Sequence, residues 1–102
     1  MKIAILSAAV QDIEAGRVFY EKQLAELGSE FVQSVLADIE ALESMHGIHP
    51  VQFECYHRLL TRRFPFAVYY TFDSTTVYVW AVLDCRRNPR RFRERLGGGA
   101  ER

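Results

Sequence analysis

The chain of 102 residues contains 49% hydrophobic and 25% charged residues, a composition that excludes a disordered or collagen-like protein and indicates a globular one. Its length fits a single domain, which we place at residues 1–96, followed by a flexible tail at residues 97–102. No signal peptide is visible, no apolar run is long enough to span a membrane, and the two cysteines are too few for a disulfide framework. We therefore expect a cytoplasmic protein without a cofactor, which acts through its surface or a partner.

The formal net charge of zero conceals a division between the two halves of the chain. Residues 1–54 hold three basic and nine acidic residues, a net charge of −6, whereas residues 55–102 hold ten arginines and four acidic residues, a net charge of +6. Such a division suggests that the second half meets an anionic partner, either a nucleic acid or an acidic protein segment. The alternative is that an acidic helical layer and a basic sheet attract each other within one fold.

The first half has the pattern of one strand and two helices. Lys2–Ser7 alternates as a short strand, and Ser7 is a candidate cap for the helix that follows. Ala8–Leu27 has helical periodicity, and Gly28–Ser29 breaks it, so that Glu30–Met45 forms a second, antiparallel helix. The second helix carries an apolar stripe of Phe31, Val35, Ile39 and Leu42. The solvent-facing sides of the two helices include Asp12, Glu14, Asp38, Glu40 and Glu43.

The second half consists of short segments rich in aromatic and β-branched residues, which favour strands. The most apolar of them, Thr76–Leu83, is expected at the centre of a sheet with both faces covered. Asn88–Pro89 ends this strand and begins a short helix, Arg90–Leu96. The other predicted segments are a loop at residues 46–50, a short extension at residues 51–55, strands at Tyr56–Arg63 and Phe66–Phe72, and a turn at residues 73–75.

These elements predict an α+β fold with an N-terminal strand, an antiparallel helical hairpin, three antiparallel strands and a short C-terminal helix. The helices are expected on one face of a mixed, four-stranded sheet, so the other face must be polar or covered. An edge of such a sheet can also be extended by a strand from a partner protein.

Four segments, in this order, resemble the toxins of the RelE/ParE type, which belong to bacterial type II toxin–antitoxin pairs. The resemblance covers roughly residues 2–96. It implies the RelE/ParE-like fold and a partner, a cognate antitoxin whose chain wraps the toxin. The four segments are Asp12–Ala15 with Phe19–Tyr20, Leu27–Gly28 with Phe31, Arg62–Tyr70, and Val79–Leu83 with Arg86–Pro89.

Cationic residues of the second half are expected on an accessible side of the sheet, opposite the acidic helices. Arg63 precedes the turn between two strands and Arg86 follows the central strand, so both are expected at one rim. RelE-type toxins cut messenger RNA in the ribosomal A site, a reaction that needs cations to hold the phosphate, and the arginine fork suits this task. The resemblance therefore makes Arg63 and Arg86 candidate catalytic residues, with His57 or Tyr70 as general acid or base. The residues expected to bind a target or the antitoxin are Arg58, Arg62, Arg87, Arg90, Arg91 and Phe92.

The chain departs from the RelE-type nucleases at chemically important positions. Those nucleases usually carry lysines near the strand that here holds Arg58–Arg63, and a Tyr or His near the C-terminus, whereas this chain has no lysine after Lys22 and offers Phe92. A phenyl ring cannot transfer a proton. We therefore favour the ParE type, whose members bind and poison DNA gyrase, over a ribosome-dependent mRNA endoribonuclease. A third hypothesis is a non-toxic α+β interaction or RNA-binding domain.

Three further patterns have less support. Four zinc-type ligands lie close together in sequence: His46, His49, Cys55 and His57. Their spacing matches no known motif, so we expect no metal. Cys85 has a cationic neighbour that lowers a thiol pKa, yet no histidine partner is fixed by the sequence. The aromatic residues of the strands can stack on bases or pack in the core, and we favour packing.

Overall fold

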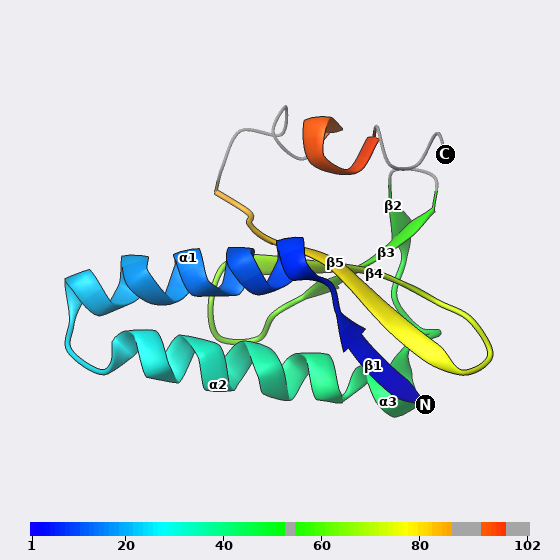
Figure 1. Cartoon of the computed structure of the whole chain (residues 1–102), viewed down its shortest axis with the longest axis horizontal. Coiled ribbons are helices and arrows are strands. Elements are labelled where there is room, and N and C mark those ends of the chain that lie inside the picture. The colour runs from blue at the N-terminus through cyan, green and yellow to red at the C-terminus, as the bar shows by residue number, and fades with distance from the viewer. Residues whose placement is uncertain (53–54, 87–92, 98–102) are drawn as a thin grey trace.

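The computed structural model describes residues 1–52, 55–86 and 93–97. It confirms the predicted α+β fold, in which a helical pair covers one face of a mixed sheet (Figure 1). The elements are, in chain order, β1 (Lys2–Ile5), α1 (Ser7–Gln23), α2 (Leu27–Glu40), α3 (Leu42–Met45), β2 (Val51–Gln52), β3 (Tyr56–Leu60), β4 (Phe66–Phe72), β5 (Thr76–Asp84) and a single helical turn, η1 (Arg93–Gly97).

The strands form one sheet in the order β1-β5-β4-β3-β2. β1 runs parallel to β5, and the other neighbouring strands are antiparallel. β5 lies between β1 and β4, as its apolar sequence predicts. The predicted extension at residues 51–55 is present as β2, so the described sheet has five strands instead of the expected four.

The helices α1 and α2 run antiparallel along one face of the sheet (Figure 1). The predicted apolar stripe of α2 is buried against α1 and the sheet. The helices approach closely at Gly16 of α1, where a Cβ atom would lie 2.5 Å from the ring of Phe31. A side chain at Gly16 would therefore force the two helices apart.

The turn between the helices comes before the predicted break at Gly28–Ser29 and is centred on Glu26. Glu26 adopts the left-handed conformation, with φ at 73°. The carboxylate of Glu21 accepts hydrogen bonds from the main-chain N–H groups of Glu26 and Gly28, both at 3.0 Å. This carboxylate stabilises a turn that lacks glycine. Gly28 instead lies inside α2, where a Cβ atom would meet the Arg17 carbonyl oxygen at 2.5 Å.

Other boundaries also differ from the prediction. Ser7 is the first residue of α1 rather than its cap. The second predicted helix is divided into α2 and α3. The strand predicted to reach Arg63 ends at Leu60, because the chain turns there toward β4. The predicted C-terminal helix is present as η1, while residues 87–92 and residues 98–102 of the predicted tail lie outside the described ranges.

The sheet has a packed cluster on each face. The face toward the helices contributes Val68, Tyr70, Val77 and Val79 to the main core. The other face carries a smaller cluster of Tyr56, Ala67, Tyr69, Ala81 and Leu96. Leu96 comes from η1, so the C-terminal turn covers part of the face that the helices leave open. None of the described helices has the length and apolar character needed to cross a membrane.

Candidate functional site

The two candidate catalytic arginines lie at one end of the sheet, where β4 begins and β5 ends. The Arg63 guanidinium lies over the ring of Phe64, 5.3 Å from its centroid. The Phe64 ring contacts the Tyr20 ring at 4.8 Å between centroids, and Arg86 Nη2 is 3.5 Å from the Tyr20 hydroxyl oxygen. Arg63 and Arg86 thus flank a pair of aromatic rings, and we call these two residues the arginine rim.

Each residue of the arginine rim is paired with a carboxylate of its own. Arg63 binds Glu30 of α2, and Arg86 donates to Asp84 from Nε and Nη2 at 3.0 and 2.8 Å. The hydrogen bonds that Arg86 donates to the Asp84 carboxylate raise the pKa of Arg86, so this guanidinium is charged at every relevant pH. Both side chains of the Arg63–Glu30 pair are about half exposed, and an exposed ion pair contributes about 0.2–1 kcal/mol, which an anionic ligand can overcome.

Several ion pairs connect arginines of the basic second half with carboxylates of the acidic helices. Arg62 donates from its main-chain N–H and its Nε to the buried carboxylate of Asp38, at 3.0 and 2.8 Å. The expectation that the arginines lie opposite the acidic helices is therefore wrong for Arg62 and Arg63. Among the described residues, three ion pairs join the basic half to the acidic helices: Arg62–Asp38, Arg63–Glu30 and Arg95–Asp12. The acidic helices and the basic half of the chain thus attract each other within the fold, which was the alternative explanation of the charge division.

Arg58 lies on the other face of the sheet, away from the helices. Its Nε donates to the Tyr69 hydroxyl at 3.1 Å, and its Nη2 lies 3.7 Å from Cys85 Sγ. Burial raises the pKa of the Cys85 thiol in spite of the nearby guanidinium. The thiol is therefore protonated at neutral pH, which disfavours the candidate role of Cys85 as a nucleophile.

His57 and Tyr70 lie together on the helix-covered face, where they hold the loop at residues 46–50. Tyr70 is fully buried and donates its hydroxyl proton to the His46 carbonyl at 2.7 Å. His49 Nδ1 lies 2.7 Å from the same hydroxyl and must then be a donor to it. The His57 ring stacks on Tyr70 and donates from Nδ1 to the His49 carbonyl at 2.9 Å. Burial raises the pKa of Tyr70 to about 12.

The candidate acid–base residues and the arginine rim occupy different places. Tyr70 is four positions along β4 from Phe66, the residue at the rim, and a strand rises about 3.3 Å per residue, which separates the two places by about 13 Å. His57 pairs with Tyr70 across the sheet and is equally distant. The structure therefore does not bring the predicted acid or base to the predicted phosphate-binding arginines.

The other predicted candidates are placed only in part. Arg87, Arg90, Arg91 and Phe92 lie outside the described ranges. Within those ranges no group of three metal-type side chains is positioned to hold an ion. The strand aromatics mostly pack in the core, whereas the Trp80 side chain is 40% exposed and donates from Nε1 to Thr71 at 2.9 Å.

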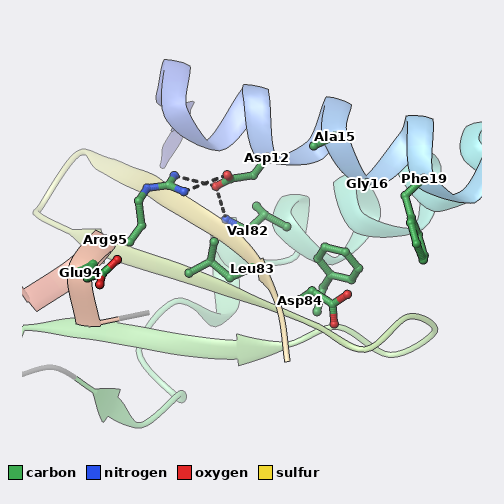
Figure 2. Close-up of a pocket in the computed structure, with 10 residues that line it drawn as sticks. Asp12, Ala15, Gly16, Phe19, Val82, Leu83, Asp84, Glu94 and Arg95 are labelled. Atoms are coloured by element: carbon green, nitrogen blue, oxygen red, sulfur yellow. Dashed lines mark hydrogen bonds and ion pairs between the residues drawn. The ribbon is translucent and has the colours of Figure 1, made fainter. Parts of the chain in front are cut away.

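A groove of about 490 Å³ lies between α1 and β5, with η1 at one end (Figure 2). Arg95 of η1 donates from Nη1 and Nη2 to the two carboxylate oxygens of Asp12, at 3.0 and 2.8 Å. Asp12 also accepts the main-chain N–H of Val82 at 3.0 Å. This hydrogen-bonded carboxylate raises the pKa of Arg95. Other lining residues are Ala15, Phe19, Leu83, Asp84 and Glu94.

Sequence reasoning missed two residues that organise these surfaces. Asp12 and Asp38 were expected on solvent-facing sides of helices, yet each carboxylate binds a main-chain N–H and an arginine. Their partners lie 24 and 70 or more positions away in sequence. Local periodicity carries no signal for contacts at such separations, so only the reciprocal charges of the two halves pointed to them.

The geometry defines an α+β protein with a helical hairpin on one face of a mixed sheet, the architecture expected from the resemblance to RelE/ParE-type toxins. Among solved structures the fold matches a chain of the "Chromosomal ParDE TA system from P. aeruginosa", with a TM-score of 0.74 and 16% sequence identity. The match covers 80% of this chain and 92% of that one. No protein-family model and no curated protein matches the chain. The resemblance is thus confirmed at the level of the fold.

Proposed function

We propose that this chain is the toxin of a type II toxin–antitoxin pair, and that it arrests growth by binding DNA gyrase in the cytoplasm. A cognate antitoxin would neutralise it. The shared fold with a chain of a ParDE toxin–antitoxin structure supports the toxin assignment. Every predicted fold element that positions the arginine rim has its counterpart in the described part of the chain.

The separation of the arginine rim from His57 and Tyr70 favours binding over RNA cleavage. Cleavage needs an acid or base within hydrogen-bond reach of the scissile group and a cation at the same phosphate. The roughly 13 Å between Tyr70 and the rim exceeds that reach several-fold. Tyr70 is also fully buried, and its hydroxyl group donates a hydrogen bond to the His46 carbonyl. Its role in this fold is therefore structural.

Induction of the chain in growing bacteria, without any antitoxin gene, tests the proposal. We expect growth arrest together with a DNA-damage response and intact messenger RNA. Sequencing of RNA 5′ ends provides the comparison, since new ends within translated codons would identify a ribosome-dependent endoribonuclease instead. Unchanged growth in the presence of folded, soluble protein would remove the toxin assignment and leave an interaction domain.

The variant Arg63→Ala/Arg86→Ala locates the working surface in the same experiment. Arg93→Ala is a matched control, because Arg93 is an exposed arginine of η1 outside the arginine rim. We expect the double variant to lose growth arrest and the control to keep it.

A further inference from the structure

The two residues of the arginine rim are held in different ways, and the difference begins with their carboxylate partners. The Glu30 side chain is 47% exposed and accepts one hydrogen bond from Arg63, from Nη2. The Asp84 side chain is only 14% exposed and accepts from both Nε and Nη2 of Arg86. A bidentate pair between an arginine and a carboxylate fixes the orientation of the guanidinium as well as its position. Arg86 is therefore held more firmly than Arg63.

The sheet fixes the main chain around Asp84. Asp84 is the last residue of β5 and pairs with Phe66 of β4. The next residue, Cys85, donates its N–H to the Pro65 carbonyl at 2.8 Å. The main-chain N–H of Arg86 then donates to Asp84 Oδ1 at 2.9 Å, which is an Asx turn. One carboxylate thus holds both the main chain and the guanidinium of Arg86.

Two aromatic residues of α1 complete the support of the Arg86 side chain. Its guanidinium carbon lies 5.8 Å from the centroid of the Phe19 ring, within the range of a cation–π contact. Its Nη2 lies 3.5 Å from the Tyr20 hydroxyl oxygen. Its Nη1 has no hydrogen-bond partner in the described part of the chain, and 54% of the side chain is exposed. Nη1 is therefore the group of this fixed guanidinium that is left to bind a partner.

We propose that Asp84 is a positioning residue of the arginine rim, which holds Arg86 in the orientation that binds the target. The Nη1 hydrogens bind an oxygen acceptor of the target, because a guanidinium only donates. A side chain that is held before binding loses less conformational entropy on binding, and a free arginine side chain loses much. Asp84 therefore strengthens binding, although its charge opposes that of Arg86. The inference rests on the proposed function, because it takes the arginine rim as the surface that binds the target.

A double-mutant cycle of Asp84→Asn and Arg86→Ala, scored by the inhibition of DNA gyrase with the purified chain, tests this proposal. Asparagine still offers an oxygen to the main-chain N–H of residue 86 but lacks the second carboxylate oxygen, so the bidentate pair is lost. We expect Asp84→Asn to weaken inhibition about two- to tenfold, the range that corresponds to ordering one flexible side chain. In the Arg86→Ala background the same substitution should have no effect.

Glu14→Gln is the matched control for the loss of a bidentate pair. Glu14 accepts from Nε and Nη2 of Arg17, both at 2.7 Å, within α1 and outside the arginine rim. This variant should inhibit as the wild-type chain does. Circular dichroism verifies that each variant is folded before its inhibition is compared.

A second measurement reports on the held guanidinium without any target. The ¹⁵N relaxation of the Nε–H group gives an order parameter for each arginine side chain of the purified chain. We expect the order parameter of Arg86 to lie well above that of Arg93, an exposed arginine of η1, and to fall toward it in Asp84→Asn. An Arg86 side chain as mobile as that of Arg93 would overturn the proposal.

Two outcomes of the cycle also contradict a positioning role. Equal losses of inhibition by Asp84→Asn in both backgrounds would show that Asp84 acts through the fold and not through Arg86. Inhibition that persists or becomes stronger in Asp84→Asn would show that the carboxylate competes with the target for Arg86.

Failure of this proposal and failure of the proposed function give different results. A wild-type chain that arrests growth without inhibiting gyrase overturns the gyrase assignment, and the inducer level needed for arrest then scores the same set of variants. A folded wild-type chain that does not arrest growth overturns the toxin assignment and, with it, the binding role of Asp84. Inhibition by the wild-type chain without the predicted coupling of Asp84 to Arg86 overturns only the positioning role.

Discussion

Replacement of Tyr70 by phenylalanine tests whether this predicted acid–base residue has a structural or a catalytic role. The substitution keeps the ring in its stack with His57 and removes only the hydroxyl group. That hydroxyl makes two hydrogen bonds of 2.7 Å, to the His46 carbonyl and to His49 Nδ1. Each such bond contributes about 0.5–1.5 kcal/mol net, so Tyr70→Phe should lower the free energy of unfolding by about 1–3 kcal/mol.

A loss of about 2 kcal/mol corresponds to a decrease in Tm of about 8–16 °C for a domain of this size, measurable by circular dichroism. Tyr78→Phe is the matched control, because the Tyr78 hydroxyl makes a single, exposed bond to Asp73 at 3.3 Å. Growth arrest, measured at a temperature where the variant is folded, should persist in Tyr70→Phe. Folded Tyr70→Phe that leaves growth unaffected would refute the reasoning and return Tyr70 to the list of catalytic candidates.

The other predictions concern the arginine rim, the Arg62–Asp38 ion pair and His49 of the loop at residues 46–50. Arg63→Ala and Arg86→Ala should each weaken growth arrest while the free energy of unfolding in urea changes by less than about 1 kcal/mol, since more than half of each arginine side chain is exposed. Asp38→Ala leaves the Arg62 N–H without an acceptor and should cost about 1–3 kcal/mol, whereas Asp38→Asn keeps an acceptor and should cost clearly less; equal losses would contradict this assignment. Burial, with the charge of His57, lowers the pKa of His49 from its usual 6.5, so the unfolded chain binds more protons and stability should fall as the pH drops below about 6.5; a pH titration of His49→Gln should show a shallower dependence.

Local sequence patterns predict those elements whose stability is decided locally. The aromatic and β-branched content of Phe66–Phe72 predicted that strand with its observed bounds. The apolar stripe through Phe31 and Ile39 predicted the buried side of α2. The turn centred on Glu26 was not predictable in this way. It depends on the Glu21 carboxylate, which accepts hydrogen bonds from two main-chain N–H groups across the turn. These bonds stabilise the left-handed conformation of Glu26, a residue that is not glycine.

The sequence predicted the part of the candidate site in which charged residues flank strands whose ends meet in the sheet. The topology brings Arg63 and Arg86 to one end of the sheet, as expected from their places beside β4 and β5. The carboxylates that hold arginines were not predictable, because Asp12 and Asp38 appear in sequence as ordinary solvent-facing helix residues. Their burial follows from packing between segments far apart in the chain, which periodicity within one helix does not report.

Inhibition of DNA gyrase by the purified chain is the most direct test of the central claim, that this fold acts by binding a protein target and not by cutting RNA. The supercoiling of relaxed plasmid by gyrase should decrease in proportion to added chain, and the Arg63→Ala/Arg86→Ala variant should inhibit less. Undiminished supercoiling at an excess of folded chain, with cleavage of messenger RNA on translating ribosomes in a parallel reaction, would contradict the claim.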